Sequence, residues 1–251
     1  MAISETPQPL TPSSGAVPKA RTAFGILGAI SVSHLLNDMI QSLILAIYPL
    51  LQNEFSLSFL QIGMITLTFQ LSSSLLQPIV GYWTDKHPMP WSLPIGMCFT
   101  LSGLVLLALS GSFETVLIAA ALVGTGSSVF HPESSRVARM ASGGRHGLAQ
   151  SIFQVGGNFG SSLGPLLAAI IIAPYGKGNV AWFVLAALLA IVVLAQVSRW
   201  YAAQHRVNKG KKAATIINPL PRNKVILAVC ILLVLIFSKY FYMARDRKSV
   251  V

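Results

Sequence analysis

Seven long apolar stretches follow one another along the chain, and the gaps between them are short. A helix needs about 20 mostly apolar residues to cross a hydrocarbon core of roughly 30 Å. Any single stretch would also suit a core helix of a large soluble protein, but seven in series predict an all-α membrane protein. The stretches cover residues 24–51, 58–83, 91–110, 115–136, 147–173, 180–200 and 224–243.

The composition agrees with this class. Hydrophobic residues make up 53% of the chain and charged residues 10%, whereas soluble domains carry about 25% charged residues. The net charge of +11 does not predict nucleic-acid binding, because the basic residues lie in the gaps between apolar stretches and are not interleaved with aromatic residues. We therefore expect the lipid bilayer, and no nucleic acid, as a partner.

The distribution of Lys and Arg predicts the orientation. Basic residues gather in alternate gaps, whereas the gaps after the first and third stretches have none and the gap after the fifth has only Lys177. Cytoplasmic loops are enriched in Lys and Arg, so the amino terminus is predicted to be cytoplasmic. The expected parts are a flexible cytoplasmic tail (1–22), a six-helix transmembrane bundle (23–200), a basic cytoplasmic linker (201–223), a seventh transmembrane helix (224–243) and a basic tail (244–251).

The seventh stretch departs from this order. It contains Lys239, and Arg245, Arg247 and Lys248 follow at once on the predicted outer side. A seven-helix receptor would be expected to place its amino terminus outside the cell, so that alternative is disfavoured. We interpret the end of the chain as a truncated seventh helix.

The first stretch carries four polar residues in its middle: His34, Asn37, Asp38 and Gln41. An ionisable residue inside a membrane helix costs about 2.5–3.5 kcal/mol on insertion scales, and it usually faces a bundle interior or a wet cavity. His34, Asp38 and Gln41 share one helix face, and Asn37 flanks it. The pattern favours a helix that lines a transport path. The alternative is that Asp38 is a buried acid bonded to a neighbouring helix.

A second polar group ends the fourth stretch, in the segment SSVFHPESSR. Glu133 and Arg136 are three residues apart, a spacing at which helical side chains pair. The segment has a loose kinship with the first stretch, since each has serine, then histidine (His34 or His131), then an acid. Internal three-helix repeats occur in transporters. The alternative is that the segment merely ends a helix at the membrane interface.

The fifth stretch has glycines at every fourth residue, Gly156, Gly160 and Gly164, followed by Pro165. Small residues at this period allow two helix backbones to approach closely, and proline bends a helix. We therefore predict that the glycines pack against another helix. Gln154 and Asn158 lie near the same stripe and are candidates for lining a cavity.

Two segments resemble motifs of the major facilitator superfamily. Gly81, Asp85 and Lys86 match its loop signature, although Pro88 replaces a glycine and Met89 and Pro90 replace basic residues, which puts the usual charge network of the loop in doubt. Gly160, Gly164 and Pro165 resemble its antiporter signature. The runs SHLLNDMIQSLILAIYPLL, FHPESSRVARMASGGRHG and FQVGGNFGSSLGPLLA further resemble a bacterial antibiotic-efflux branch, and this likeness extends to about Met243.

The resemblance implies twelve helices in two six-helix halves, export of small antibiotics coupled to proton entry, and the bacterial inner membrane. It implies a missing carboxy-terminal half, so the chain alone is expected to be inactive. The candidates for proton coupling are Asp38, His34 and Glu133. The candidates for the substrate cavity are Asn37, Gln41, His131, Arg136, Gln154 and Asn158.

Three alternatives to an exporter differ in class. An importer of small metabolites or sugars would share the fold, and a membrane remnant without transport would share the helices. An enzyme is disfavoured because the sequence shows no thiolate–histidine pair, phosphate-binding loop or metal-ligand spacing. Neither a metal site nor a cofactor is therefore expected.

Overall fold

The computed structural model describes residues 21–208 and 221–246. The described residues are almost entirely helical, with no strand among them. They fall into two units that divide between Asn208 and Lys209, and each unit is described by itself. Residues 1–20, 209–220 and 247–251 lie outside the described part, and with them most of the predicted tails and linker.

The first apolar stretch forms two helices. α1 spans Phe24–Ala46 and α2 spans Tyr48–Phe55, with a break at Ile47. The prediction of one stretch over 24–51 misses this break. Pro49, in the first turn of α2, explains it, because proline has no N–H and its ring collides with the carbonyl four residues earlier.

The next two stretches each give one span. α3 (Phe59–Gln70), the π-helical turn η1 (Leu71–Leu75) and α4 (Leu76–Lys86) form one continuous helix, and α5 covers Ser92–Ala108. A capping box between Ser58 and Gln61 starts α3. Such a box satisfies backbone N–H groups that the first helical turn leaves unpaired.

The fourth stretch becomes α6, Phe113–Ala141, which a capping box between Ser112 and Thr115 starts. The fifth forms α7 (His146–Leu167), the π-helical turn η2 (Ala168–Ile172) and α8 (Ala173–Tyr175). Pro174 comes two residues after the end of η2. Its missing N–H cannot bond the carbonyl of Ile170 inside η2, which accounts for the irregular hydrogen-bond ladder there.

The sixth stretch begins at the 3-10 turn η3 (Lys177–Ala181) and continues as α9, Trp182–Asn208. The predicted bundle ends at residue 200, but α9 extends beyond it, because the polar residues that follow are also helical. The second unit contains α10, Arg222–Asp246. The described side chains of α10 are exposed, most of them large and apolar.

Five helical segments of the described chain are long and apolar enough to cross a membrane: 24–46, 59–86, 113–141, 146–175 and 177–207. α5 is a shorter apolar helix of 17 residues, which lies at the lower end of the length that can span a bilayer.

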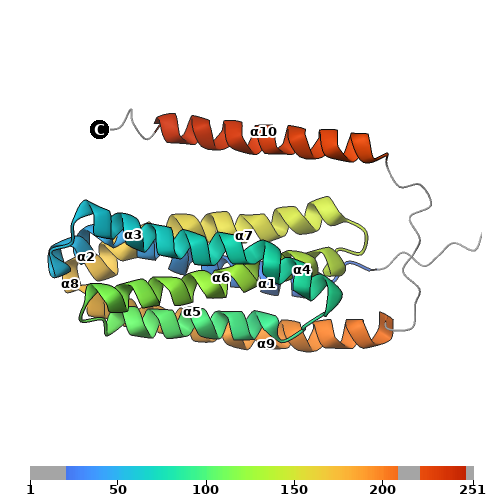
Figure 1. The fold of residues 1–251 in the computed structure, drawn as a ribbon. Coiled ribbons are helices and arrows are strands. Elements are labelled where there is room, and N and C mark those ends of the chain that lie inside the picture. Colours follow the sequence, from blue (N-terminus) through green and yellow to red (C-terminus); the bar gives the residue numbers. More distant parts are fainter. Residues whose placement is uncertain (1–20, 209–220, 247–251) are drawn as a thin grey trace, which may run out of the picture. The chain divides into compact units, whose positions relative to one another are not determined.

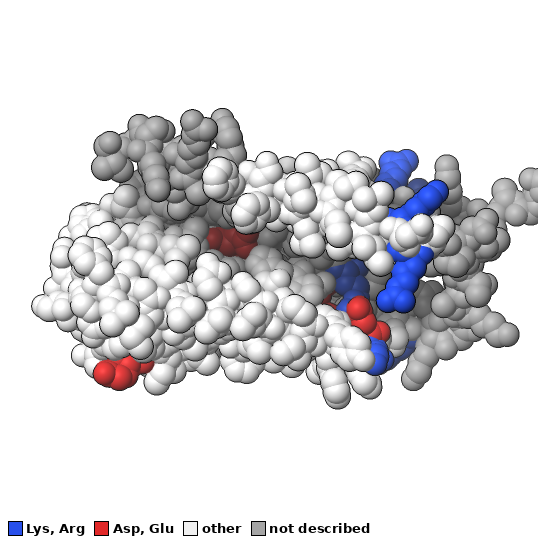
Figure 2. Space-filling model, turned by 45° about the horizontal axis from the view of Figure 1, so that its top comes forward, with Lys and Arg blue, Asp and Glu red and all other residues white. Residues whose placement is uncertain are grey.

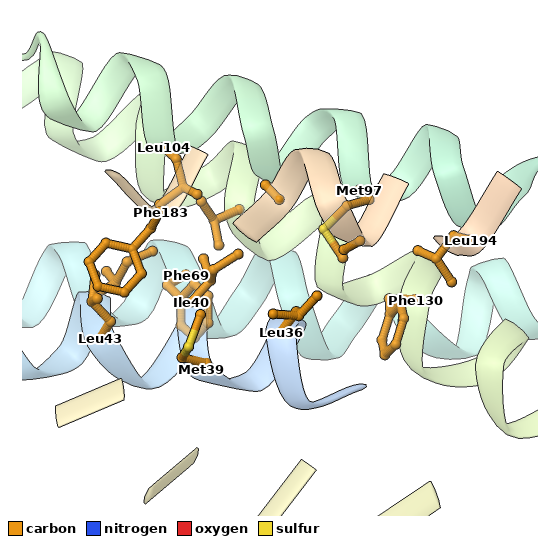
Figure 3. Close-up of a cluster of buried hydrophobic side chains, with 14 of the residues drawn as sticks. Leu36, Met39, Ile40, Leu43, Phe69, Met97, Leu104, Phe130, Phe183 and Leu194 are labelled. Atoms are coloured by element: carbon orange, nitrogen blue, oxygen red, sulfur yellow. The ribbon is translucent and has the colours of Figure 1, made fainter. Parts of the chain in front are cut away.

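α1 and α6 occupy the centre of the first unit (Figure 1). α1 packs against α6, α7 and α9, and α6 also contacts α3, α4 and α5. Leu36, Met39, Ile40 and Leu43 of α1 meet buried side chains of the surrounding helices (Figure 3). Polar side chains that α1 and α6 carry in their middles are therefore held inside the bundle or on its inner wall.

α7 lies directly against the backbone of α1. A Cβ atom at Gly156 would overlap the carbonyl of Ser31, and one at Gly160 would overlap the carbonyl of Leu35. One at Gly164 would overlap Ser42. The three glycines therefore form the α1–α7 contact, and the contact places α7 beside the polar residues of α1.

Different contacts close the two ends of this unit. At one end, the backbone N–H of Ala23 donates to the carbonyl of Ala141, at 2.9 Å. At the other end, the ammonium group of buried Lys177 lies 3.2 Å from Glu54 Oε1 and bonds Ser110. The first end contains the start of α1 and the end of α6, so these two helices run in opposite directions.

Candidate functional site

Three titratable side chains from α1 and α6 meet inside the bundle. His34 Nε2 lies 3.2 Å from Asp38 Oδ2, and His131 Nε2 lies 3.8 Å from Asp38 Oδ1. The two imidazole rings are 5.4 Å apart and nearly perpendicular. The side chain of His34 is 3% exposed, that of Asp38 is 18% exposed and that of His131 is 28% exposed. We call these three residues the Asp38 cluster.

α7 holds the ring of His34 in place. His34 Nδ1 lies 2.8 Å from the backbone carbonyl oxygen of Phe153, and the two rings stack with their centroids 4.0 Å apart. Gly157 lies next to the imidazole, where an added Cβ atom would overlap the ring. The close α1–α7 packing therefore aims Nε2 of His34 at Asp38.

Two neighbouring polar residues of α1 find hydrogen-bond partners for some of their side-chain atoms but not for all. Asn37 donates from Nδ2 to Asp38 Oδ1 at 3.1 Å, and Ser127 of α6 donates to Gln41 Oε1 at 3.0 Å. Asn37 Oδ1 and Gln41 Nε2 are buried without a hydrogen-bond partner. Buried polar atoms are nearly always bonded, so these two atoms are groups that water or a bound molecule would satisfy.

A second charged group, the Arg136 cluster, joins α4 to α6. Arg136 Nη1 lies 2.6 Å from Glu133 Oε1, and Nη2 bonds Asp85. Arg136 also donates to the carbonyl oxygen of Thr84, at 2.9 Å. Glu133 is fully buried. The guanidinium group faces two carboxylates, so its charge is neutralised and it is not free to hold an anion.

The loop signature takes part in this second cluster. Asp85 bonds Arg136 although the glycine and basic positions after it are replaced, so a charge contact of the loop persists. Gly81 packs against Pro132 of α6, with 3.7 Å between an added Cβ atom and the proline Cβ. Lys86 contacts Tyr82 within α4. Lys86 therefore interacts with its own helix.

A cavity of about 670 Å³ opens beside the Arg136 cluster. Its volume is within the range of small-molecule pockets, roughly 300–1,000 Å³. On the face that Figure 2 shows, residues other than Lys, Arg, Asp and Glu cover most of the described surface. The cavity is lined by Gly81, Asp85, Pro132, Ser135, Arg136, Arg139, His146 and Gln150.

Gln154 and Asn158 lie elsewhere, on an exposed stripe of α7. Gln154 Nε2 donates to Asn158 Oδ1 at 3.2 Å, and both side chains are exposed. An exposed amide pair on a membrane helix is costly in lipid and favourable where the helix faces water or another polar surface. This stripe of α7 is therefore suited to a cavity wall.

Sequence reasoning missed several residues that shape the Asp38 cluster. The Phe153 carbonyl is a backbone atom, and no side-chain pattern marks it. Gly157 had a visible signal, because it stands outside the four-residue glycine period and directly follows Gly156. Ser127 was visible as a polar residue of α6, but its partner Gln41 belongs to another helix.

Comparison with known proteins assigns the family. The sequence profile of the Major Facilitator Superfamily matches residues 30–245. The chain belongs to the Major Facilitator Superfamily. The resemblance to this family found in the sequence is thereby confirmed, and so is the all-α membrane fold. Members of this superfamily are membrane transporters rather than enzymes.

Two curated members of the superfamily are similar to the chain. The fosmidomycin resistance protein of Escherichia coli (strain K12) is 87% identical over 244 residues, which cover 97% of this chain and 60% of that protein. The uncharacterized MFS-type transporter YfnC of Bacillus subtilis (strain 168) is 44% identical over 77% of this chain and 48% of its own length. The chain thus spans about half the length of these relatives.

Solved structures of transporters share the fold. A bacterial homolog of the human lysosomal transporter Spinster, inward-facing and unoccupied, aligns with a TM-score of 0.54 at 19% identity, over 74% of this chain and 43% of that chain. The peptide transporter POT in complex with sulfate aligns with a TM-score of 0.53 at 20% identity, over 91% and 48%. The chain matches somewhat less than half of each transporter.

Proposed function

We propose that this chain provides the amino-terminal part of a proton-driven exporter of small antibiotics, fosmidomycin among them. The observation that carries the proposal is the 87% identity to the fosmidomycin resistance protein over 97% of the chain. At such identity, the residues of the inner wall are expected to be largely shared. The wall therefore serves the same kind of substrate.

The Asp38 cluster is suited to proton coupling. Proton-driven export needs an acid that is protonated in one access state and ionised in the other. Asp38 is partly exposed and lies beside two imidazoles, side chains that can accept and donate a proton. Glu133 is fully buried and paired with Arg136. Asp38 is therefore the first candidate for the proton carrier, with His34 as its partner, and Glu133 is the second.

The substrate is proposed to contact unpaired and exposed polar groups on the same wall. Gln154 and Asn158 are exposed on α7. Asn37 Oδ1 and Gln41 Nε2 of α1 are buried without a hydrogen-bond partner, so a substrate would reach them only after neighbouring side chains move. These groups offer both donors and acceptors. Arg136 is proposed to act as a counter-ion for Glu133 and Asp85 rather than as an anion site.

The chain is proposed to lie in the bacterial inner membrane with its amino terminus in the cytoplasm. The end that joins Ala23 to Ala141 also contains Arg139 and Arg145, whereas the opposite end carries Lys177 in a buried pair with Glu54. This distribution agrees with the enrichment of Lys and Arg in cytoplasmic loops. The opposite wall of the path is proposed to come from a segment equivalent to the rest of the longer relatives.

The direction in which the substrate moves distinguishes an exporter from an importer. The experiment uses everted membrane vesicles that contain this chain extended by the remaining segment of the Escherichia coli relative. An inside-acid proton gradient should drive fosmidomycin into these vesicles, which corresponds to export from the cell. Accumulation that is independent of the gradient, or gradient-driven uptake of a sugar but not of fosmidomycin, would contradict the proposal.

A further inference from the structure

The contact between His34 and Asp38 requires a cation. The carbonyl of Phe153 can only accept a hydrogen bond, so Nδ1 of His34 must carry the hydrogen at the 2.8 Å contact. In the neutral ring, Nε2 then has a lone pair and no hydrogen. It points at Asp38 Oδ2, a second acceptor, from 3.2 Å. Two lone pairs at this distance repel each other unless a proton or a metal ion lies between them.

His131 lies beside the same carboxylate, and its distance suits a shared metal ion better than a hydrogen bond. The 3.8 Å between His131 Nε2 and Asp38 Oδ1 is too long for a hydrogen bond. It is close to the separation of two ligands on one ion, because tetrahedral ligands at about 2.1 Å from zinc lie about 3.4 Å from one another. One ligand atom from each of the three residues lies within 4.8 Å of the others.

We propose that His34, Asp38 and His131 form a three-ligand site for a divalent transition-metal ion, with Zn²⁺ as the best match. Two imidazole nitrogens and one carboxylate oxygen suit zinc, and three protein ligands leave the fourth position open to water. Asp38 and His131 are partly exposed, so water could reach the site. Sequence spacing did not reveal the site, because His131 comes from a different helix.

The surroundings of the cluster resemble the support that metal ligands need. A metal-bound histidine usually donates its other ring N–H to a carbonyl or carboxylate, which fixes the tautomer. His34 makes this bond to Phe153 at 2.8 Å, inside the α1–α7 contact. Asn37 donates to Asp38 Oδ1 at 3.1 Å and orients the carboxylate. A bound ion would tie α1 to α6 at the level of Asp38, and it would compete with protonation of the same carboxylate.

Direct metal binding tests this inference without relying on transport. The whole chain, purified in detergent without a histidine tag, would be titrated with Zn²⁺ against a chromophoric chelator, and with Co²⁺ as a spectroscopic substitute. The structure predicts one ion per chain and the visible absorption of tetrahedral Co²⁺. Asp38→Asn and His131→Gln should each weaken binding by more than the roughly 10–100-fold that loss of a supporting partner costs.

Matched variants separate this site from other metal-binding groups. His87→Gln removes an exposed histidine that stacks on Trp83, and it should leave the affinity unchanged. Gly157→Ala keeps all three ligands but displaces the His34 ring, so it should weaken binding. Circular dichroism and gel filtration would check that each variant is folded. Equal affinity in the parent chain and a folded Asp38→Asn variant, or no binding by the parent chain, would overturn the proposal.

Discussion

Gly157 of α7 lies against the imidazole of His34 on α1, at a point where any side chain would overlap the ring. The absence of a Cβ atom there allows Nδ1 of His34 to reach the Phe153 carbonyl at 2.8 Å. One small residue therefore sets the direction in which His34 presents Nε2. It links the packing of two helices to the geometry of the Asp38 cluster.

Gly157→Ala should lower the thermal stability of the chain. Alanine favours a helix over glycine by about 1 kcal/mol, but the added methyl group must push the His34 ring away, which breaks the Phe153 bond and the ring stack. Gly147→Ala, in the first turn of the same helix, meets open space and is the matched control. We expect Gly157→Ala to melt below the parent chain and Gly147→Ala to match or exceed it. Equal melting temperatures for both variants would contradict the packing argument.

Removing Arg136 should destabilise the chain more than removing the charges of Arg136 and Glu133 together. Loss of one partner leaves the fully buried Glu133 carboxylate uncompensated, and breaking a buried pair costs about 3–5 kcal/mol. The test is a thermal-unfolding cycle of Arg136→Gln, Glu133→Gln and the double variant. The double variant should regain part of the loss. Strictly additive effects would show that Arg136 does not stabilise the buried Glu133 carboxylate in this way.

Single cysteines test the predicted orientation. In a chain in which Cys98 and Cys230 are replaced by serine, Arg145→Cys and Gly178→Cys each introduce one exposed thiol at opposite ends of the unit. A membrane-impermeant maleimide added to intact cells should label the Gly178 variant only. Everted vesicles should reverse the result. Labelling of the Arg145 variant in intact cells would place the amino terminus outside.

The chain alone should confer no resistance to fosmidomycin. Its α1 and α7 present one polar wall, and the relatives to which it is similar are longer, since the chain covers 60% of the Escherichia coli protein. Growth of a susceptible host in a fosmidomycin gradient would be measured with this chain, with the remaining segment, and with both. Resistance is expected only with both. Clear resistance from the chain alone would refute the need for a second wall.

The sequence predicted features that depend on residues within one helix, but it did not predict contacts that depend on how helices pack together. The apolar stretches located the spans, the glycine period located a close helix contact, and the spacing of Glu133 and Arg136 matched an ion pair, because all of these depend on neighbours within one helix. The meeting of His34 with His131, and the bond to the Phe153 carbonyl, depend on how three helices pack. The break at Ile47 had a local signal in Pro49, which the hydropathy of the stretch concealed. The roles assigned to Asp38, His34 and Glu133 stay predictions.

Proton-driven export by an Asp38→Asn variant tests the central claim most directly. Everted vesicles that contain this chain extended by the remaining segment of the Escherichia coli relative would be energised with an inside-acid gradient, and fosmidomycin accumulation would be compared with that of Glu114→Gln, which removes an exposed acid. Asn keeps the size of the side chain but cannot carry a proton. Gradient-driven accumulation should be lost in Asp38→Asn at equal membrane content and persist in the control. Undiminished gradient-driven accumulation in Asp38→Asn would contradict the account.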